Sequence, residues 1–305
     1  MRYISVCSGI ESATVAWEGL GWEPIAFSEI DPHASALLHH HYPNVPNLGD
    51  FTNIGVDYEN TAGLIVGGTP CQSFSVIGNR RGLDDPRGNL AIEFVRLANR
   101  LRCRWILFEN VPGILSSDGG LDFRIFLRSL AQFGYGFAYR ILDAQYIRTH
   151  GYPRAVPQRR RRVFVVGYIG DWRPPAAVLF EPKMLRGTAP PSRQAGEKAA
   201  TTVTSNLGTG GFNDSDLALT IGTKIRYDLD ENYTLQNDQV RQITPVECER
   251  LMGFPDDYTL VPYRNRMMAD SARYRMLGNS MAVNVIQWIG NRINMFEKVY
   301  NLSHI

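Results

Sequence analysis

The stretch Ser5-Val6-Cys7-Ser8-Gly9-Ile10-Glu11-Ser12 decides the fold class, because it combines the end of a strand, a tight turn of small residues and the start of a helix. From there to about residue 170, apolar runs alternate with longer helix-like segments, a pattern typical of an α/β sheet. We expect strands at residues 3–6, 24–27, 64–66, 105–108, 137–142 and 163–166, and helices at residues 12–20, 33–41, 90–101 and 121–133. The sequence therefore predicts a doubly wound, Rossmann-like α/β domain.

The composition of the chain changes after Tyr168. Residues 171–239 are rich in Pro, Gly, Thr, Ser and Asn and show no helical period, which predicts a smaller, irregular domain. A helix start follows at Thr244-Pro245-Val246-Glu247, and residues 281–299 have the pattern of a last helix. We therefore expect a catalytic and cofactor-binding domain at 1–170, a small domain at 171–270, and a C-terminal helix within 271–305 that returns to the first domain.

Length and composition exclude several classes of protein. The chain has 305 residues, of which 44% are hydrophobic and 20% charged, so it can form a large core and is not expected to be disordered. No apolar run approaches the roughly 18 residues that a membrane span requires. No signal-peptide pattern opens the chain either. We expect a soluble, cytoplasmic protein without a membrane partner.

The formal net charge of +2 hides an uneven distribution. Residues 1–75 contain one basic and eight acidic side chains, whereas residues 140–193 contain eleven basic and three acidic ones. Such a division suits a polyanion at one surface and a different ligand at another. On charge alone, nucleic-acid binding and a merely solvated face remain open alternatives.

The four cysteines are at positions 7, 71, 103 and 248. They are too far apart for a CxxC pair and too few for a disulfide framework, so we expect no metal site of that kind. Cys71 follows Pro70 on a loop directly after the strand expected at residues 64–66. That position favours an exposed nucleophile over the buried structural role that cysteine usually has.

A candidate acid follows the strand expected at residues 105–108. The carboxyl ends of neighbouring parallel strands meet at one edge of a sheet, so Glu109 is expected to share a pocket with Cys71. Burial in such a pocket raises the pKa of a carboxyl group and lets it donate a proton. Alone, Glu109 is equally compatible with a solvated loop or a helix N-terminus.

Four consecutive arginines, residues 159–162, lead into the strand expected at 163–166. Side chains alternate along a strand. Arg160 and Arg162 are therefore expected on one side, towards the site. Arg159 and Arg161 are expected on the other, towards solvent or the phosphates of DNA.

The turn at residues 7–12 lies where nucleotide-like cofactors bind in doubly wound folds. It lacks a GxGxxG pattern, which disfavours a dinucleotide, and Glu29 follows Gly9 by 20 residues, where a carboxylate can bind ribose hydroxyls. A plain tight turn with a surface acid remains the alternative. Asn279 and Ser280, before the last helix, suit a polar ligand or serve only as a helix cap.

Five blocks, taken together and in this order, resemble the DNA cytosine-5 methyltransferase family. They are Pro70-Cys71-Gln72, Glu109-Asn110-Val111, Gln158 with Arg160 and Arg162, Thr244-Pro245 through Gly253-Phe254-Pro255, and Gly278-Asn279-Ser280, and the match runs from Tyr3 to about Asn294. The chain departs from the family at the cofactor turn, where Cys7, Glu11 and Ser12 stand in place of an aromatic residue and glycines. The resemblance implies an S-adenosylmethionine-dependent methyltransferase sheet with a smaller target-recognition domain.

The resemblance also implies a mechanism. The Cys71 thiolate would add to C6 of cytosine while Glu109 supports protonation of N3, which prepares C5 to take the methyl group of S-adenosylmethionine. Loss of the C5 proton would then release Cys71. Arg162 would orient the base and Arg160 would support the site. The target cytosine must be flipped out of duplex DNA, and residues 76–88 resemble the family's mobile loop that closes over DNA.

The cofactor site is implied in the same way. Glu29 would bind the ribose hydroxyls, and Asp50 and Phe51 would lie near the adenine. The implied contacts are Cys7, Ser8, Gly9, Ile10, Glu11, Ser12, Glu29, Ile30, Asp50, Phe51, Pro70, Leu90, Asn279 and Ser280. Cys7 is thus expected to line the pocket, and Cys103 and Cys248 to be packing residues.

Residues 171–239 occupy the family's target-recognition position, with the base-reading candidates Arg193, Gln194, Thr202, Thr204, Asn206, Asn213 and Arg226. Two other functions stay open. One is a tRNA cytosine-5 methyltransferase, whose typical Cys-Phe-Thr element is absent here; the other is a catalytically silent DNA-binding module, against which the intact catalytic residues argue. We expect a monomer that binds double-stranded DNA, with a cognate restriction endonuclease, acting separately, as a second candidate partner.

Overall fold

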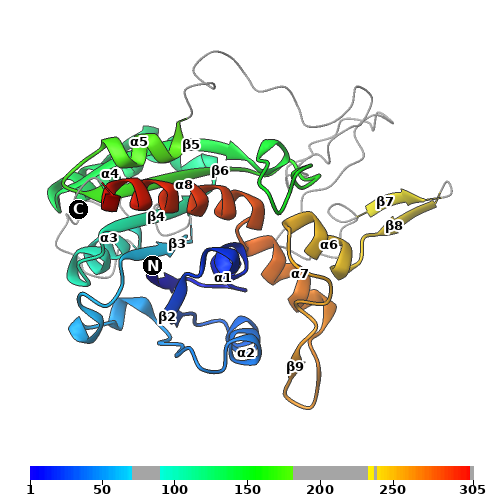
Figure 1. The fold of residues 1–305 in the computed structure, drawn as a ribbon. Coiled ribbons are helices and arrows are strands. Elements are labelled where there is room, and N and C mark those ends of the chain that lie inside the picture. Colours follow the sequence, from blue (N-terminus) through cyan, green and yellow to red (C-terminus); the bar gives the residue numbers. More distant parts are fainter. Residues whose placement is uncertain (71–89, 181–232, 237–238, 303–305) are drawn as a thin grey trace.

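A six-stranded sheet forms the centre of the computed structural model, which describes residues 1–70, 90–180, 233–236 and 239–302 (Figure 1). Its strands are β1 (Arg2–Val6), β2 (Glu23–Ser28), β3 (Leu64–Gly67), β4 (Trp105–Asn110), β5 (Tyr135–Asp143) and β6 (Arg161–Ile169). Their spatial order is β2-β1-β3-β4-β6-β5. Strand β6 runs antiparallel to both of its neighbours, while β1, β2, β3 and β4 pair in parallel. The predicted doubly wound, Rossmann-like sheet is confirmed, with one reversed strand.

Helices cover both faces of this sheet, because side chains alternate along each strand. On one face, Leu64, Val66 and Leu107 pack with residues of α1 (Ser12–Trp17), α5 (Arg173–Leu179) and α8 (Val283–Leu302). On the other, Ile65 and Ile106 pack with residues of α3 (Leu90–Arg100) and α4 (Leu121–Gln132). Strands β3 and β4 thus each contribute to two separate hydrophobic clusters, which fixes the three-layer architecture.

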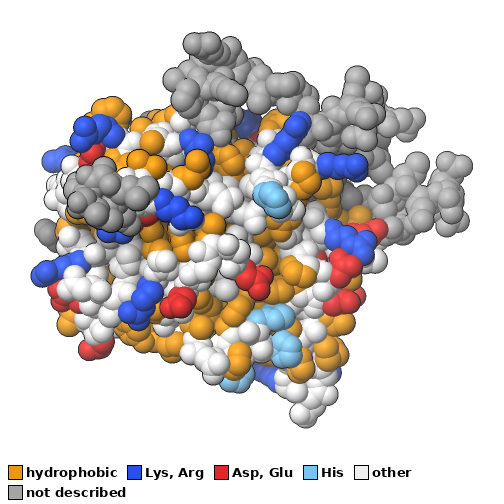
Figure 2. All heavy atoms as spheres, in the orientation of Figure 1, with side chains coloured by type: hydrophobic (Ala, Val, Ile, Leu, Met, Phe, Trp, Pro, Cys, Tyr) orange, Lys and Arg blue, Asp and Glu red, His pale blue; other side chains and the backbone are white. Residues whose placement is uncertain are grey.

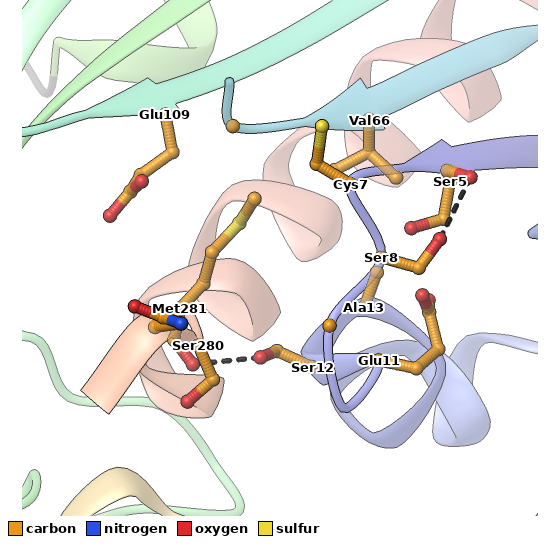
Figure 3. Close-up of a pocket in the computed structure, with 13 residues that line it drawn as sticks. Ser5, Cys7, Ser8, Glu11, Ser12, Ala13, Val66, Glu109, Ser280 and Met281 are labelled. Atoms are coloured by element: carbon orange, nitrogen blue, oxygen red, sulfur yellow. Dashed lines mark hydrogen bonds between the residues drawn. The ribbon is translucent and has the colours of Figure 1, made fainter. Parts of the chain in front are cut away.

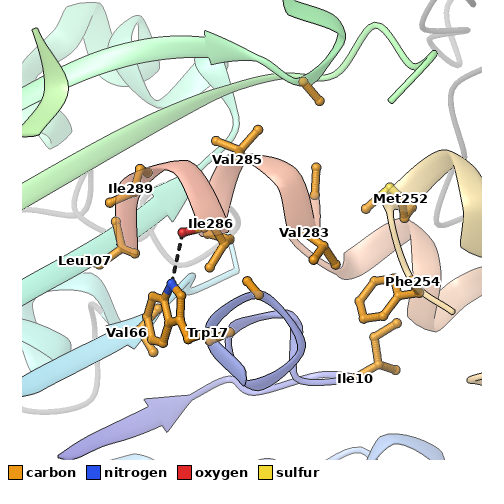
Figure 4. Packing of buried hydrophobic residues seen from close by; sticks show 14 of the residues in the cluster. Ile10, Trp17, Val66, Leu107, Met252, Phe254, Val283, Val285, Ile286 and Ile289 are labelled. Atoms are coloured by element: carbon orange, nitrogen blue, oxygen red, sulfur yellow. Dashed lines mark hydrogen bonds between the residues drawn. The ribbon is translucent and has the colours of Figure 1, made fainter. Parts of the chain in front are cut away.

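Helix α8 packs closely on α1, although 269 residues separate their contact points. The indole Nε1 of Trp17 donates a hydrogen bond of 3.0 Å to the carbonyl of Ile286 (Figure 4). A Cβ atom at Gly290 would lie 2.1 Å from that same Nε1, so only glycine fits there. The last helix is therefore locked against the first, and it carries the residues before it back to the sheet.

The sheet has a topological switch point beside β1, where ligands bind in doubly wound folds. The chain leaves β1 for β2 on one side and then returns to β3 on the other. The carboxyl ends of β1, β3 and β4 lie at one edge, and because β6 is reversed, its first residues meet them there. At this edge, Glu109 of β4 lies opposite Phe164 of β6, and Gly67 of β3 lies opposite Phe108 of β4.

The remaining elements follow α5 in the sequence. Helix α6 (Pro245–Met252) begins with the predicted cap: Thr244 and Glu247 form reciprocal side-chain to backbone bonds. It is followed by the short strands β9 (Pro262–Tyr263) and β10 (Arg266–Met267) and by α7 (Asp270–Asn279). Helix α2 (Pro32–His41), from the first part of the chain, lies next to β9. None of the helices in the described part of the chain is long and apolar enough to cross a membrane.

Two predictions about local structure, and one alternative that the sequence left open, were wrong. The chain from residue 171 contains α5, because Pro174 and Pro175 fit the first turn of a helix, where their missing N–H groups are not needed. The stretch to residue 239 also includes the strand β7 (Tyr233–Gln236), which pairs with β8 (Gln239–Gln242). Asn279 is the last residue of α7, so neither it nor Ser280 caps the final helix. The division into domains at residues 170 and 270 stays a prediction.

Candidate active site

The turn after β1 has an unusual backbone. Cys7, Gly9 and Glu11 all have left-handed φ angles, of 48°, 55° and 60°. For residues with a side chain, this conformation costs on the order of 1–2 kcal/mol and persists only where neighbouring groups hold it. We call residues 7–12 the cofactor turn, in keeping with the role predicted for it.

Strand β2 holds the cofactor turn from one side. Glu29, directly after β2, accepts the Gly9 N–H on Oε2 at 2.7 Å and the N–H groups of Ile30 and Asp31 on Oε1 at 2.9 and 2.7 Å. A carboxylate oxygen has two lone pairs, so Oε2 keeps one free for a hydroxyl donor. Ile30 beside it is 75% exposed, an uncovered apolar side chain that an adenine ring would shield.

A pocket opens between the cofactor turn and the start of α8 (Figure 3). Its lining includes eight residues from the predicted site: Cys7, Ser8, Gly9, Glu11, Ser12, Glu109, Asn279 and Ser280. Five lining residues were not predicted: Ser5, Ala13, Val66, Gly68 and Met281. Of these, Gly68 carried a signal in the sequence, since the Gly67-Gly68 pair follows a buried strand.

The other predicted cofactor residues lie outside this lining. Ile10 is fully buried and Phe51 is 4% exposed, both within the core. Asp50 caps the short helix Phe51–Asn53 through the N–H of Thr52. Burial, together with the charges of Glu29 and Asp50, raises the pKa of the Cys7 thiol to about 12. A pKa this high keeps Cys7 a neutral thiol and disfavours it as a thiolate nucleophile.

Two more predicted contacts border the segment around Cys71. Pro70 is exposed, and Leu90, the first residue of α3, packs against the second core cluster. Cys71 and residues 76–88 lie outside the described residues, as do the seven base-reading candidates between 193 and 226. Cys103 and Cys248 are buried packing residues, as predicted.

Glu109 projects into the pocket from β4, next to the backbone that leads to Cys71 (Figure 3). A Cβ atom on Gly68 would lie 2.9 Å from the Glu109 carbonyl and 3.1 Å from its Oε2, so glycine is required for the two strands to end side by side. Asn110 donates from Nδ2 to the Thr69 carbonyl at 3.0 Å. This bond fixes the start of the Pro70 segment, and the role of Asn110 was missed because the sequence shows only a polar residue at a strand end.

The four arginines at the start of β6, of which Arg161 and Arg162 belong to the strand, alternate as predicted. Arg159 and Arg161 are exposed, while Arg160 is 3% exposed and Arg162 is half-buried. Arg162 forms an ion pair with Glu109, Nε to Oε1, at 3.2 Å. Burial raises the pKa of Glu109, and the charges of Arg162 and Arg160 partly offset that increase. A raised pKa lets this carboxyl group hold a proton to higher pH than an exposed glutamate does.

Arg160 binds backbone instead of the acid. Its Nη2 donates to the carbonyls of Gly278 and Ser280 at 3.0 and 2.6 Å, at the C-terminal end of α7 where the helix dipole favours a cation. Burial and the charge of Arg162 lower the pKa of Arg160 to about 9. Arg160 therefore connects the acid side of the pocket to the segment that carries Asn279 and Ser280.

Two sequence comparisons cover most of the chain. A family model described as C-5 cytosine-specific DNA methylase matches residues 1–184 and 183–295. The type II methyltransferases M.DsaV of Dactylococcopsis salina and M.HhaI of Haemophilus parahaemolyticus are 28% and 24% identical, each over 96% of this chain and over 86% and 94% of their own lengths. A relative from Escherichia phage P1, named DNA N-6-adenine-methyltransferase, is 30% identical over 95% of this chain, which spans 61% of that relative's length.

Solved structures share the fold at low identity. The Dnmt2 methyltransferase of S. pombe has a TM-score of 0.66 at 19% identity, covering 99% of both chains. The Entamoeba histolytica methyltransferase EhMeth has a TM-score of 0.62 at 16% identity, covering 98% of both. No group of three His, Cys, Asp or Glu side chains within the described ranges is arranged to hold a metal ion. The chain belongs to the C-5 cytosine-specific DNA methylase family, whose enzymes methylate cytosine in DNA with S-adenosylmethionine.

Proposed function

We propose that this protein transfers a methyl group to C5 of a cytosine flipped out of duplex DNA, through a covalent bond between Cys71 and C6. The observation that carries the proposal is the pairing of Glu109 with Arg162 at the edge of the sheet where Pro70 leads to Cys71. Cytosine C5 is a poor nucleophile, so a thiolate that adds to C6 pushes the electrons of the C5–C6 double bond towards C5.

Glu109 and Arg162 would prepare the base for this addition. Glu109, with its raised pKa, donates a proton to N3 or shares one with it, which draws electrons out of the ring as the thiolate adds. Arg162, held by the same carboxylate, would present a cation to the carbonyl oxygen O2 of cytosine and fix the orientation of the base. After methylation, loss of the C5 proton restores the double bond and expels the Cys71 thiolate.

The residues of the cofactor side fit S-adenosylmethionine, which supplies an electrophilic methyl group when bound. Glu29 keeps a lone pair for a ribose hydroxyl, and the exposed face of Ile30 suits the adenine. Asn279 and Ser280 line the other end of the pocket, near Glu109. On this proposal, the cofactor would lie between the switch point of the sheet and Glu109, the acid that would meet the base.

Duplex DNA containing 5-fluorocytosine at the target site provides the direct test. Fluorine at C5 is not lost as a proton is, so the purified protein with S-adenosylmethionine should form an adduct that survives denaturing electrophoresis. Cys71→Ala should form none, and Cys103→Ala, a buried packing residue, is the matched control that should retain it. An adduct that persists in Cys71→Ala would show that another residue is the nucleophile.

Two relatives make the substrate itself worth testing. The phage P1 protein is named for adenine N6, and Dnmt2 folds leave a tRNA cytosine substrate open. An amino nitrogen such as adenine N6 needs no thiol addition, so the Cys71 and Glu109 pair favours cytosine. Duplex DNA and tRNA are each incubated with the protein and S-adenosylmethionine that carries a tritiated methyl group, and the labelled nucleosides are then identified. The label should appear as 5-methylcytosine in DNA. Label only in tRNA, or only at adenine, would overturn the proposal.

The basic side of the molecule supports a DNA partner. In Figure 2, most acidic side chains visible on this face lie in its lower half, whereas Lys and Arg also occupy the upper half. Residues 144–162 contain six arginines and no acidic residue. This arrangement suits contacts with DNA phosphates. We further propose, from the family resemblance, that the protein acts as a cytoplasmic monomer and that any cognate endonuclease is a separate protein.

A further inference from the structure

The cofactor turn is held by more than β2. The hydroxyl of Tyr258 donates a hydrogen bond of 2.9 Å to the carbonyl of Ile10, 248 residues away in the sequence. Burial raises the pKa of Tyr258 far above its ordinary value, so this hydroxyl stays protonated and remains a donor. Ile10 lies between Gly9 and Glu11, both in the left-handed conformation, so the bond meets the turn at its most strained point.

Tyr258 is itself fixed by its neighbours. Its ring lies between His41 and Phe254, with stacked centroids 4.3 and 5.0 Å away. His41 Nε2 also contacts the Tyr258 carbonyl at 2.8 Å, and the Tyr42 hydroxyl lies 3.0 Å from that of Tyr258. Figure 4 shows the Ile10 side chain directed towards Phe254 in the same cluster. The ring therefore has one position, and its hydroxyl has one direction.

Helix α6 sets that position. Glu249, fully buried in α6, accepts the N–H of Asp257 at 2.7 Å and the N–H of Thr259 at 2.8 Å, so one carboxylate holds both neighbours of Tyr258. Arg273 of α7 pairs with this carboxylate at 3.2 Å. A continuous series of bonds thus runs from α6, which begins directly after β8, to the cofactor turn.

We propose that Tyr258 is a positioning residue for the cofactor: its bond to the Ile10 carbonyl keeps the cofactor turn in the conformation that receives S-adenosylmethionine. Three residues with left-handed φ angles in five positions do not hold this shape by local preference, since two of them carry side chains. Without the Tyr258 hydroxyl, the Ile10 carbonyl loses its partner and the turn samples other conformations. Cofactor binding must then select the competent one, which weakens affinity. The inference rests on the proposed cofactor site.

Calorimetric titration of the full-length protein with S-adenosylmethionine and with S-adenosylhomocysteine tests this role. Tyr258→Phe should raise the Kd for both about five- to tenfold, the effect of losing one buried hydrogen bond. In methylation assays the KM for the cofactor should rise in parallel, with kcat at saturating cofactor close to wild type. Tyr42→Phe is the matched control: it removes a hydroxyl from the same network but leaves the bond to Ile10, and its Kd should stay within twofold of wild type.

A second variant keeps the test informative if Tyr258→Phe does not fold. His41→Leu removes a ring stack and a hydrogen bond from Tyr258 at a half-buried site and should raise the cofactor Kd about two- to threefold. A wild-type protein that binds no cofactor would overturn the pocket assignment itself. Wild-type affinity in folded Tyr258→Phe, or a loss of kcat without a change in Kd, would overturn only the role of Tyr258.

Discussion

The two sides of the pocket are built in opposite ways. On the cofactor side, backbone groups of a strained turn are matched with partners from β2, from Tyr258 and from the segment before α8, where Ser12 donates to the Met281 carbonyl at 2.8 Å. On the base side, buried polar atoms are left over: the donors Nε and Nη1 of Arg160, and the donor Nε2 and acceptor Oε1 of Gln158, have no hydrogen-bond partner in the described part of the chain.

This difference teaches what each side requires of its ligand. A side whose backbone bonds are matched, with the Glu11 Oε2 as its one unpartnered buried side-chain atom among the described residues, offers a preformed shape to which its ligand adds a few contacts. Unpaired charges and donors cost free energy when they are buried. A ligand that is rich in hydrogen-bond acceptors offsets this cost when it binds. We therefore expect substitutions on the base side to reduce the rate of chemistry, and substitutions on the cofactor side to change binding and stability.

The largest effect is expected at Glu109. Glu109→Gln keeps the shape of the side chain but removes the proton donor, so kcat should fall about 100- to 10,000-fold while the Kd for S-adenosylmethionine stays within twofold. Because burial raises the pKa of Glu109, wild-type kcat should decline as rising pH ionises this group, and the variant should lack that decline. Single-turnover assays of the wild type and the variant over a pH series measure both the loss of rate and its pH dependence.

Glu59→Gln is the control for that variant, because it removes the same charge from an ion pair with Arg102, at 2.7 Å, elsewhere in the molecule. It should leave kcat unchanged. A Glu109→Gln variant that loses cofactor affinity as much as rate would break the separation between the two sides of the pocket.

A smaller but broader effect is expected at Arg160, which joins the two sides. Arg160→Met leaves the carbonyls of Gly278 and Ser280 without their donor, so the segment with Asn279 loosens. We expect both a higher cofactor Kd and a lower kcat, each by about 10- to 100-fold, since hydrogen bonds to charged groups contribute about 1.5–3 kcal/mol. Calorimetry and methylation kinetics give the two values separately.

The exposed neighbour Arg161 supplies the matched substitution. Arg161→Met should leave the cofactor Kd unchanged, because its side chain points away from the site. If Arg160→Met altered only one of the two quantities, Arg160 would belong to one side of the pocket and would not connect them.

The smallest effect on activity is expected at Glu11, the one residue of the cofactor turn with a buried, unpartnered side-chain oxygen, Oε2, among the described residues. Burial raises the pKa of Glu11 to about 7, above the value of about 4.3 in an unfolded chain. The folded state therefore holds its proton more tightly. The stability from this group is complete below pH 4.3 and is lost as pH rises through 7.

Glu11→Gln should remove this dependence while keeping the cap on the N–H of Thr14. Between pH 5 and pH 8, the free energy of unfolding of the wild type should fall relative to the variant by on the order of 3 kcal/mol. Urea denaturation at several pH values measures the difference. Parallel curves for the two proteins would show that Glu11 does not titrate in this range.

Much of this site was visible in the sequence because its residues follow strands. Cys7, Glu29 and Glu109 each stand directly after an apolar run, and a doubly wound fold brings such positions to one edge. The alternation of the arginines was predictable for the same reason, since period two is a property of the strand itself.

Contacts between distant segments were not predictable. Nothing local relates Tyr258 to Ile10 or Met281 to Ser12, because these bonds depend on how α6 and α8 pack. The direction of β6 was also hidden, since a strand has the same apolar pattern whichever way it runs. Helix α7 was missed because its single glycine, Gly278, looks like a turn in sequence but lies within the last helical turn.

The reversal of β6 has a consequence for how such an enzyme can be altered. A strand that enters the sheet at the reactive edge leaves it at the opposite edge, so the chain passes through Ile169 and α5 before the segment expected to recognise the target begins. Insertions or replacements between α5 and α6 are therefore separated from Glu109 in the sequence by β5, β6 and α5. If specificity is read by this segment, as the sequence predicts, replacements there are expected to change the target while β4 and β6, which carry Glu109 and Arg162, keep their register.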